Sequence, residues 1–133
     1  MVIGLYPMVA DILHCGHVIS IELAKRQCDW LIVALHCNPI YKSPTQSIYE
    51  RYMQLRSIKY IDEIIPYSNK DDVELLIRSL QFDRYFLGED YMGKEFEGKS
   101  LLLEMGKEII YLPRKHLLSS TELKMRICQN EQR

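Results

Sequence analysis

Apolar residues follow two alternating patterns along this chain: short runs that are apolar throughout, and longer segments in which apolar residues recur at helical spacing. The short runs contain β-branched or aromatic residues and predict buried strands at residues 2–6, 30–35, 63–65, 85–87 and 109–112. Pro7 is expected to end the first of these strands. The helical spacing predicts helices at residues 16–27, 47–60, from 71 onward, 100–105 and from 119 onward.

Strands that alternate with helices of this length are typical of a parallel sheet covered by helices. Residues 2–35 contain a strand, a helix and a second strand, the βαβ unit whose crossover is right-handed almost without exception. The sequence therefore predicts an α/β fold in which a five-stranded parallel sheet has helices on both faces. Ligands of such sheets bind beyond the carboxyl ends of the strands, where the strand order reverses, so candidate residues should follow the strands.

The composition is that of a single globular domain spanning residues 1–133, with 47% apolar and 26% charged residues. A formal net charge of -1 and the lack of a long basic run argue against a nucleic-acid partner, whereas a small anionic ligand needs only a few local cations. Every apolar run is far shorter than the ~20 residues of a membrane-spanning helix. Four cysteines without CxxC spacing, and an amino terminus unlike a signal peptide, predict reduced thiols in a cytoplasmic protein.

A cluster of candidate residues occurs where the first strand gives way to the first helix, at residues 11–17. A helix amino terminus offers N–H groups and the positive end of the helix dipole, and Gly16 lets a bulky anion approach. His14 and His17, one turn apart, are both able to donate hydrogen bonds to phosphate oxygens. These residues predict a phosphate site. The alternative is that the two histidines only cap the turn.

A zinc site is the competing interpretation of the same region, because His14, Cys15, His17, His36 and Cys37 all lie near strand ends that are expected to be neighbours. Imidazole and thiolate groups are ligands that zinc prefers. However, the spacing fits no zinc finger or ribbon, and Cys15 is expected to point away from the two histidines. The phosphate interpretation is therefore favoured.

A second candidate anion site lies near the start of the last helix. Ser119, Ser120 and Thr121 supply hydroxyl and N–H groups there, and Arg114 can reach a polyphosphate across the loop. A plain helix cap is the alternative, because Ser119 and Glu122 fit a capping box on their own.

Four segments occur in a fixed order, at residues 11–17, 59–66, 88–94 and 112–121. Together they resemble the successive signatures of the small cytidylyltransferases, and most closely those of the glycerol-3-phosphate cytidylyltransferases. The resemblance implies a Rossmann-like doubly wound sheet and a homodimer. It also implies a reaction that joins CTP, with Mg²⁺ on its phosphates, to a small phosphorylated alcohol and releases pyrophosphate.

The resemblance assigns roles to individual residues. His14, His17, Lys42 and Arg114 would be catalytic, with the histidines and Arg114 on the triphosphate. Lys42 and Lys59 would bind the acceptor phosphate. Further contacts to the nucleotide would come from Val9, Ala10, Asp11, Gly16, Asp90, Ser119, Ser120 and Thr121.

Two departures from the family pattern affect the turn and the acceptor. Residues 8–11 stand where most relatives have Gly, then Thr, Ser or Cys, then Phe or Tyr, then Asp, so the freedom of glycine to take φ > 0 is lost at Met8. The helix from residue 71 carries Asp71, Asp72 and Glu74 where the glycerol-phosphate members carry a substrate lysine. An acidic wall suits a hydroxyl-rich or amine-bearing acceptor better. Candidate acceptors are thus glycerol 3-phosphate, sugar phosphates and phosphorylated amino alcohols.

Two alternatives stand beside the CTP-dependent transferase. One is an adenylyltransferase of the heptose-phosphate type, because a segment similar to residues 11–18 also occurs there. The other is a catalytically silent nucleotide-binding relative, which the altered turn at residues 8–10 permits.

Overall fold

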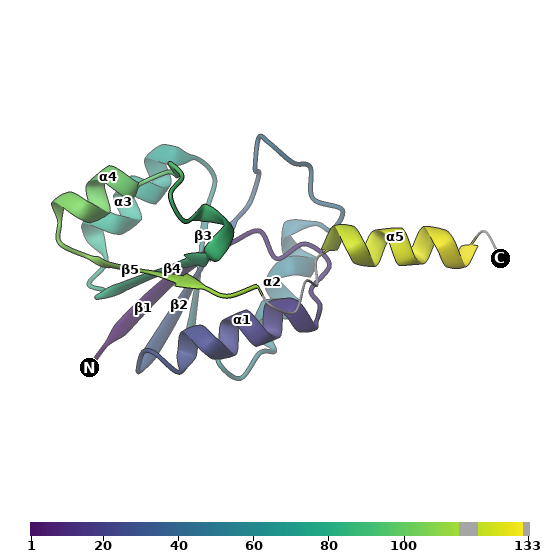
Figure 1. Ribbon diagram of the computed structural model, residues 1–133, viewed down its shortest axis with the longest axis horizontal. Coiled ribbons are helices and arrows are strands. Elements are labelled where there is room, and N and C mark those ends of the chain that lie inside the picture. The colour runs from purple at the N-terminus through teal and green to yellow at the C-terminus, as the bar shows by residue number, and fades with distance from the viewer. Residues whose placement is uncertain (115–119, 132–133) are drawn as a thin grey trace.

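The computed structural model describes residues 1–114 and 120–131 of the chain (Figure 1). Its strands are β1 (Ile3–Met8), β2 (Trp30–His36), β3 (Glu63–Tyr67), β4 (Arg84–Gly88) and β5 (Glu108–Leu112). They pair in parallel in the order β3-β2-β1-β4-β5. The strand order reverses between β1 and β4, which places the expected ligand site beyond the carboxyl ends of these two strands.

Helices cover both faces of the sheet. They are α1 (Cys15–Lys25), α2 (Ile48–Arg56), α3 (Lys70–Ser79), α4 (Lys99–Glu104) and α5 (Ser120–Glu131), with the short 3-10 helix η1 (Glu89–Tyr91) after β4. Figure 1 shows α1 and α2 on one face and α3 and α4 on the other, whereas α5 extends away from the body of the molecule. The predicted Rossmann-like, doubly wound α/β fold is confirmed.

Two apolar layers, one on each face, hold the sheet between its helices. Successive residues of β2 alternate between the layers. Leu31, Val33 and Leu35 pack with α1 and α2, whereas Ile32 and Ala34 pack with α3 and α4. All five side chains are buried, and burial of one Val, Leu or Ile side chain stabilises the fold by about 1.5–3 kcal/mol. The core therefore fixes the strand ends from which the site is built.

The prediction that Pro7 ends the first strand is wrong, because β1 continues to Met8. β4 pairs with β1 only at Gly4 and Leu5, so Pro7 lies beyond that ladder, and on the other side it pairs in register with Ala34 of β2. A proline is tolerated there because its missing N–H removes no bond to β4. The longer strand places the turn between β1 and α1 at the carboxyl edge of the sheet.

The carboxyl end of α2 differs from the prediction. α2 begins after Ser47, whose side chain accepts a hydrogen bond from the N–H of Glu50 in a capping box, and it ends at Arg56 instead of near residue 60. The predicted cap of the last helix, Ser119, lies outside the described residues. In the described part of the chain, none of the helices is long and apolar enough to cross a membrane.

Candidate active site

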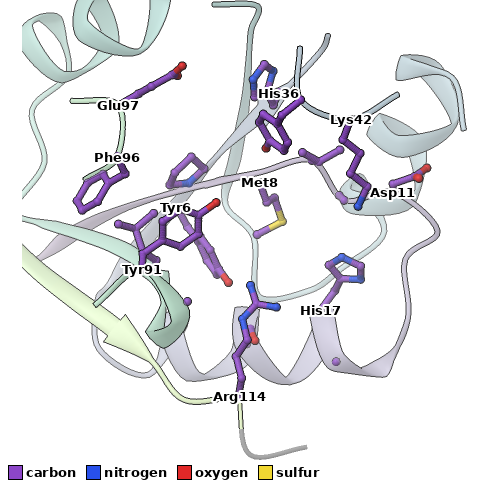
Figure 2. Close-up of a pocket in the computed structure, with 18 of the residues that line it drawn as sticks. Tyr6, Met8, Asp11, His17, His36, Lys42, Tyr91, Phe96, Glu97 and Arg114 are labelled. Atoms are coloured by element: carbon purple, nitrogen blue, oxygen red, sulfur yellow. The ribbon is translucent and has the colours of Figure 1, made fainter. Parts of the chain in front are cut away.

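A cavity of about 560 Å³ opens at the carboxyl ends of the strands, where the strand order reverses. His14, His17, Lys42 and Arg114 all line it, so the four residues predicted to be catalytic come together at one site. Figure 2 shows the side chain of Arg114 rising toward the centre of the cavity, with His17 and Lys42 to one side. A cavity of this volume accommodates a small-molecule ligand.

The two histidines form a helix cap at the start of α1. Nδ1 of His14, the N-cap residue, accepts a hydrogen bond from the N–H of Gly16 at 3.0 Å. Nδ1 of His17 accepts from the N–H of His14 at 3.2 Å, which completes a capping box built from imidazoles. An Nδ1 atom that accepts a hydrogen bond carries no proton, so the proton of each neutral ring is on Nε2. Capping and phosphate binding therefore use different nitrogens of the same side chains and are compatible.

His17 is neutral at pH 7. Burial of its ring, together with the charges of His14, Arg114 and Lys42, lowers the pKa of His17 to about 4. A neutral His17 donates a hydrogen bond through Nε2 without adding positive charge. The positive charge beside His17 in the cavity therefore comes from Lys42 and Arg114.

Arg114 follows β5 and is oriented by the acidic residues of η1. Its Nε atom lies 3.0 Å from Oδ1 of Asp90, and its backbone N–H donates to Oε1 of Glu89 at 3.0 Å. Asp90 itself does not line the cavity. Asp90 therefore positions Arg114. A contact between Asp90 and a nucleotide stays a prediction.

Asp11 borders the cavity, but its side chain is only 1% exposed. Its two carboxylate oxygens accept hydrogen bonds from the N–H groups of Thr45 and Gln46, both at 2.9 Å, and Nζ of Lys124 in α5 lies 3.2 Å from Oδ2. Burial alone would raise the pKa of Asp11, but these hydrogen bonds and the Lys124 ammonium outweigh burial and lower it. In the structure Asp11 thus anchors the loop that carries Lys42, and its contact with a nucleotide stays a prediction.

Arg51 of α2 is buried, although the sequence pattern does not distinguish it from a solvated cation. It is 2% exposed and donates to the carbonyl oxygens of Val9, His36 and Cys37 at 3.0, 2.7 and 2.8 Å. Val9 follows β1, His36 is the last residue of β2 and Cys37 follows it. One planar guanidinium thus joins the two segments that border the cavity. Arg51 lies one helical turn before the buried Leu55, but this spacing alone does not reveal the carbonyl groups that bind it.

The turn between β1 and α1 has its left-handed residues at Ala10 and Ile12, with φ of 57° and 48°. Met8, where the family pattern has glycine, is the last residue of β1. Ile12 is β-branched, so this conformation is strained by roughly 1–3 kcal/mol. The N–H of Ile12 donates to Oε1 of Gln46 at 2.8 Å, which ties the turn to the loop after β2. Val9 and Ala10 line the cavity, as a role in binding the nucleotide requires.

The predicted residues of the last loop and helix are only partly described. Gly16 and Thr121 line the cavity. Ser119 lies outside the described residues, and of Ser120 only the backbone is described, at the start of α5.

Lys59 is not brought to the site. It lies between α2 and β3, and its Nζ atom is 5.2 Å from the centroid of the Tyr60 ring. A connection from a helix to the next parallel strand lies at the amino edge of the sheet, opposite the edge where ligands bind. This placement does not support the predicted contact between Lys59 and the acceptor.

The zinc interpretation finds no support in the described part of the chain. There, no three His, Cys, Asp or Glu side chains form a group that could hold a metal ion. Nδ1 of His14 and of His17 already accept backbone hydrogen bonds, and Cys15 is exposed.

The cavity has a second end that the sequence motifs do not indicate. We call it the aromatic end, and it is lined by His36, Tyr41, Tyr67, Tyr85, Tyr91, Phe96 and Glu97. We call the end formed by His14, His17, Lys42, Arg114 and Thr121 the phosphate end. Tyr41 and Tyr91 lie just after β2 and β4, where ligand contacts were expected, whereas Tyr67 ends a strand that carried no candidate residue.

A comparison with known families agrees with this arrangement of fold and site. Residues 5–126 match the family model described as Cytidylyltransferase-like, so the chain belongs to this family and is a nucleotidyltransferase. It is 32% identical to the glycerol-3-phosphate cytidylyltransferase of Bacillus subtilis over 122 residues, which cover 89% of this chain and 91% of the relative. The Staphylococcus aureus protein of the same name is 31% identical and covers 88% of both chains. The resemblance predicted from the sequence motifs is confirmed.

Other relatives share the domain within different proteins. The bifunctional protein HldE of Streptomyces coelicolor is 29% identical over 90% of this chain but only 27% of its own length. Among solved structures, the lipopolysaccharide core biosynthesis protein of Thermoplasma volcanium has a TM-score of 0.67 at 22% identity, covering 85% of this chain and 95% of that one. Pantothenate synthetase of Thermus thermophilus has a TM-score of 0.60 at 16% identity, with 85% and 56% covered. These two structures share the fold.

Proposed function

We propose that this nucleotidyltransferase joins CTP to a small phosphorylated alcohol, such as glycerol 3-phosphate, and yields a CDP-activated product and pyrophosphate. The observation that carries the proposal is the convergence of His14, His17, Lys42 and Arg114 at the phosphate end. Several donors and cations at one end of a cavity suit a polyphosphate. The similarity to the two glycerol-3-phosphate cytidylyltransferases supports cytidine as the base and a glycerol phosphate-like acceptor.

In the proposed reaction, an oxygen of the acceptor phosphate attacks the α-phosphorus of CTP. The new P–O bond forms as the bond from the α-phosphorus to the oxygen that bridges to the β-phosphate breaks, and pyrophosphate leaves with that electron pair. No general base is needed, because the attacking oxygen is already anionic. The protein has to hold two anions together and neutralise the charge that develops on the α-phosphorus and the leaving group.

Each proposed role follows from the position of the residue. His14 and His17 donate from Nε2 to phosphate oxygens of CTP. Arg114 neutralises the triphosphate, and Lys42, on its anchored loop, neutralises the acceptor phosphate and the transition state. Thr121 contacts the triphosphate from the start of α5. Further contacts to CTP remain predictions for Val9, Ala10, Asp11, Gly16, Asp90, Ser119 and Ser120. A contact of Lys59 with the acceptor phosphate also remains a prediction.

Mg²⁺ is expected to arrive with the phosphates of CTP. Among the described residues, Asp11 is the carboxylate at the phosphate end, and both of its oxygens already accept hydrogen bonds within the protein. This donor set fits an ion that is held mainly by phosphate oxygens and water. When bound, the ion adds positive charge to the triphosphate.

A second candidate function is transfer from ATP to a sugar phosphate. The similarity of residues 11–18 to the corresponding segment of heptose-phosphate adenylyltransferases favours it. Both candidates place a triphosphate at the phosphate end and differ in the base and the acceptor.

The test is pyrophosphate release with CTP and ATP side by side, each with Mg²⁺ and with glycerol 3-phosphate, a sugar phosphate or a phosphorylated amino alcohol. CTP should be preferred. His14→Ala and His17→Ala should each lower kcat/KM by about 10²–10³-fold, the usual effect of removing one transition-state donor. His14→Asn separates catalysis from capping, because Asn is a good N-cap residue that lacks the Nε2–H group. Arg56→Gln is the matched control for Arg114→Gln, since Arg56 is an exposed cation outside the cavity.

Each outcome of this assay has a clear consequence. A preference for ATP would replace the proposed function by the second candidate. Wild-type activity, within a few-fold, in both His→Ala variants would contradict the assignment of the site. If CTP raises the melting temperature but no acceptor yields pyrophosphate, the chain is a catalytically silent relative.

A homodimer is the proposed assembly. α5 extends from the body of the molecule (Figure 1) and exposes Met125 and Ile127. Such an exposed apolar surface is common where two copies associate. Light scattering on a gel-filtered sample checks this proposal, and the mass of a single chain would contradict it.

A further inference from the structure

The aromatic end of the cavity differs in charge from the phosphate end. Among the described residues that line it, none carries a positive charge at pH 7, since burial and the charge of the neighbouring Arg51 lower the pKa of His36 against the opposing charge of Glu97. The carboxylate among these described lining residues belongs to Glu97. A phosphate would be repelled there, so this end suits a neutral or positively charged group.

One wall of the aromatic end consists of His36, Tyr41 and Tyr67, from the end of β2, the loop after it and the end of β3. The rings of His36 and Tyr67 lie 4.6 Å apart between centroids, and Tyr41 stands edge-on to His36 at 6.3 Å. Nδ1 of His36 is buried and has no hydrogen-bond partner among the described residues. This wall therefore combines two phenol rings with one buried imidazole.

The opposite wall consists of Tyr85, Tyr91 and Phe96, from β4, η1 and the segment after it. Phe96 lies parallel to Tyr85, with 6.3 Å between centroids and 7° between planes, and Tyr91 meets Phe96 edge-on at 6.2 Å. Figure 2 shows Phe96 and Tyr91 on one side of the cavity and His36 on the other. The aromatic end is therefore bounded by rings on two sides.

The charge of Glu97 acts on both walls. Burial raises the pKa values of Tyr41, Tyr67 and Tyr85, and the nearby carboxylate of Glu97 raises them further. Glu97 takes part in none of the salt bridges of the described residues, whereas Glu95, two positions earlier, pairs with a lysine of α4 at 3.6 Å. Glu97 thus brings negative charge that no side chain of the described part neutralises.

We propose that the acceptor is a phosphorylated amino alcohol, with its phosphate at the phosphate end and its ammonium group at the aromatic end. Aromatic rings attract a cation through the negative face of the π-system, and a carboxylate adds a full charge to that attraction. Glycerol 3-phosphate offers only neutral hydroxyls to the same walls. This inference rests on the proposed transfer to a phosphate acceptor and names the chemical class of that acceptor.

The ammonium group takes no part in the bond changes. The acceptor's phosphate oxygen forms the bond to the α-phosphorus of CTP, pyrophosphate leaves with the electron pair of the broken bond, and the ammonium group keeps its substituents. Stacked rings also bind nucleobases. The unneutralised charge of Glu97 favours a cation over a neutral cytosine.

The experiment compares phosphocholine, O-phosphoethanolamine and glycerol 3-phosphate as acceptors, with saturating CTP and Mg²⁺ and the full chain, by pyrophosphate release. At least one ammonium-bearing acceptor should have a kcat/KM roughly tenfold or more above that of glycerol 3-phosphate. Glu97→Gln should lower that preferred activity roughly tenfold and change activity with glycerol 3-phosphate less than about threefold. The matched control is Glu95→Gln, because Glu95 is exposed and lies outside the cavity. Equal melting temperatures of the two variants would show that both are folded.

The outcomes separate this inference from the proposed function. A higher kcat/KM with glycerol 3-phosphate than with both ammonium-bearing acceptors would overturn the inference and leave the proposed function intact. A Glu97→Gln variant that raises the KM for CTP with every acceptor would assign the aromatic end to the base, and so overturn the inference as well. No pyrophosphate with any of the three acceptors would contradict the proposed function and the inference together.

Discussion

The guanidinium of Arg114 passes beside Gly88 so closely that a Cβ atom at position 88 would lie 2.6 Å from its Nε atom. The same Cβ atom would lie 2.5 Å from Oδ1 of Asp90. The space left by glycine is thus filled by the ion pair between Asp90 and Arg114. The last residue of β4 therefore helps to position a cation of the phosphate end.

Gly88→Ala should lower kcat/KM for pyrophosphate release by roughly 10–10²-fold, because its methyl group displaces Arg114 from the phosphate end. All three atoms that the methyl group meets belong to the flexible, exposed side chains of Asp90 and Arg114, so the variant should fold with a nearly unchanged melting temperature. Steady-state kinetics and a thermal melt check both parts. Full activity would show that the position of Arg114 is unimportant for transfer.

The strands and the convergence of the phosphate end were predictable from the sequence. A strand that is buried on both faces is apolar at nearly every position, as in β2, so the sequence alone identifies it. The rule that parallel strands present their carboxyl ends at one edge then brings His14, Lys42 and Arg114 together, although 100 residues separate the first from the last. No knowledge of individual contacts is needed for that step.

Side-chain direction and loop path were not predictable. Arg51 is buried because four carbonyl groups converge on it, and periodicity does not reveal such a convergence. The aromatic end joins Tyr67, the last residue of β3, with Glu97 of the segment between η1 and α4, and no sequence pattern states that this segment passes over the end of β3. Lys59 lies outside the described lining of the cavity, and a motif match does not state at which edge of the sheet a side chain lies.

His17 should make folding stability sensitive to acid. Its pKa is about 4 in the folded protein against an ordinary value of 6.5, so between these pH values the unfolded chain binds more protons than the folded one. The free energy of unfolding should therefore decrease as the pH falls from about 6.5 to about 4, and the contribution of His17 should be constant above that window. Denaturant titrations over this pH range check the trend.

His17→Gln should lose part of this pH dependence. His36 should account for another part, since burial lowers its pKa too. An NMR titration gives the direct measurement, and a midpoint for the His17 ring near 6.5 would contradict the predicted burial.

Asp11→Ala should loosen the loop that carries Lys42. The change leaves the N–H groups of Thr45 and Gln46 without their acceptors, at about 1–3 kcal/mol for each donor that stays buried. The melting temperature should fall, proteolysis within residues 37–47 should accelerate, and the KM for the acceptor should rise. The melting temperature of Asp11→Asn should lie between those of the wild type and Asp11→Ala, because the one carbonyl oxygen of asparagine retains one of the two hydrogen bonds. Unchanged proteolysis in the alanine variant would mean that other contacts hold the loop.

Ile12→Asn should stabilise the protein, although it replaces an apolar side chain by a polar one. Ile12 is held at φ 48°, a region that Asn adopts more readily than a β-branched residue, and it does not belong to either apolar core layer. Relief of the strain should raise the free energy of unfolding by about 1 kcal/mol, measured by urea denaturation at an unchanged m-value. The matched control is Ile19→Asn, since Ile19 is exposed in α1, where the same exchange should cost a few tenths of a kcal/mol. If both variants lose stability equally, the backbone at Ile12 stores no strain that asparagine relieves.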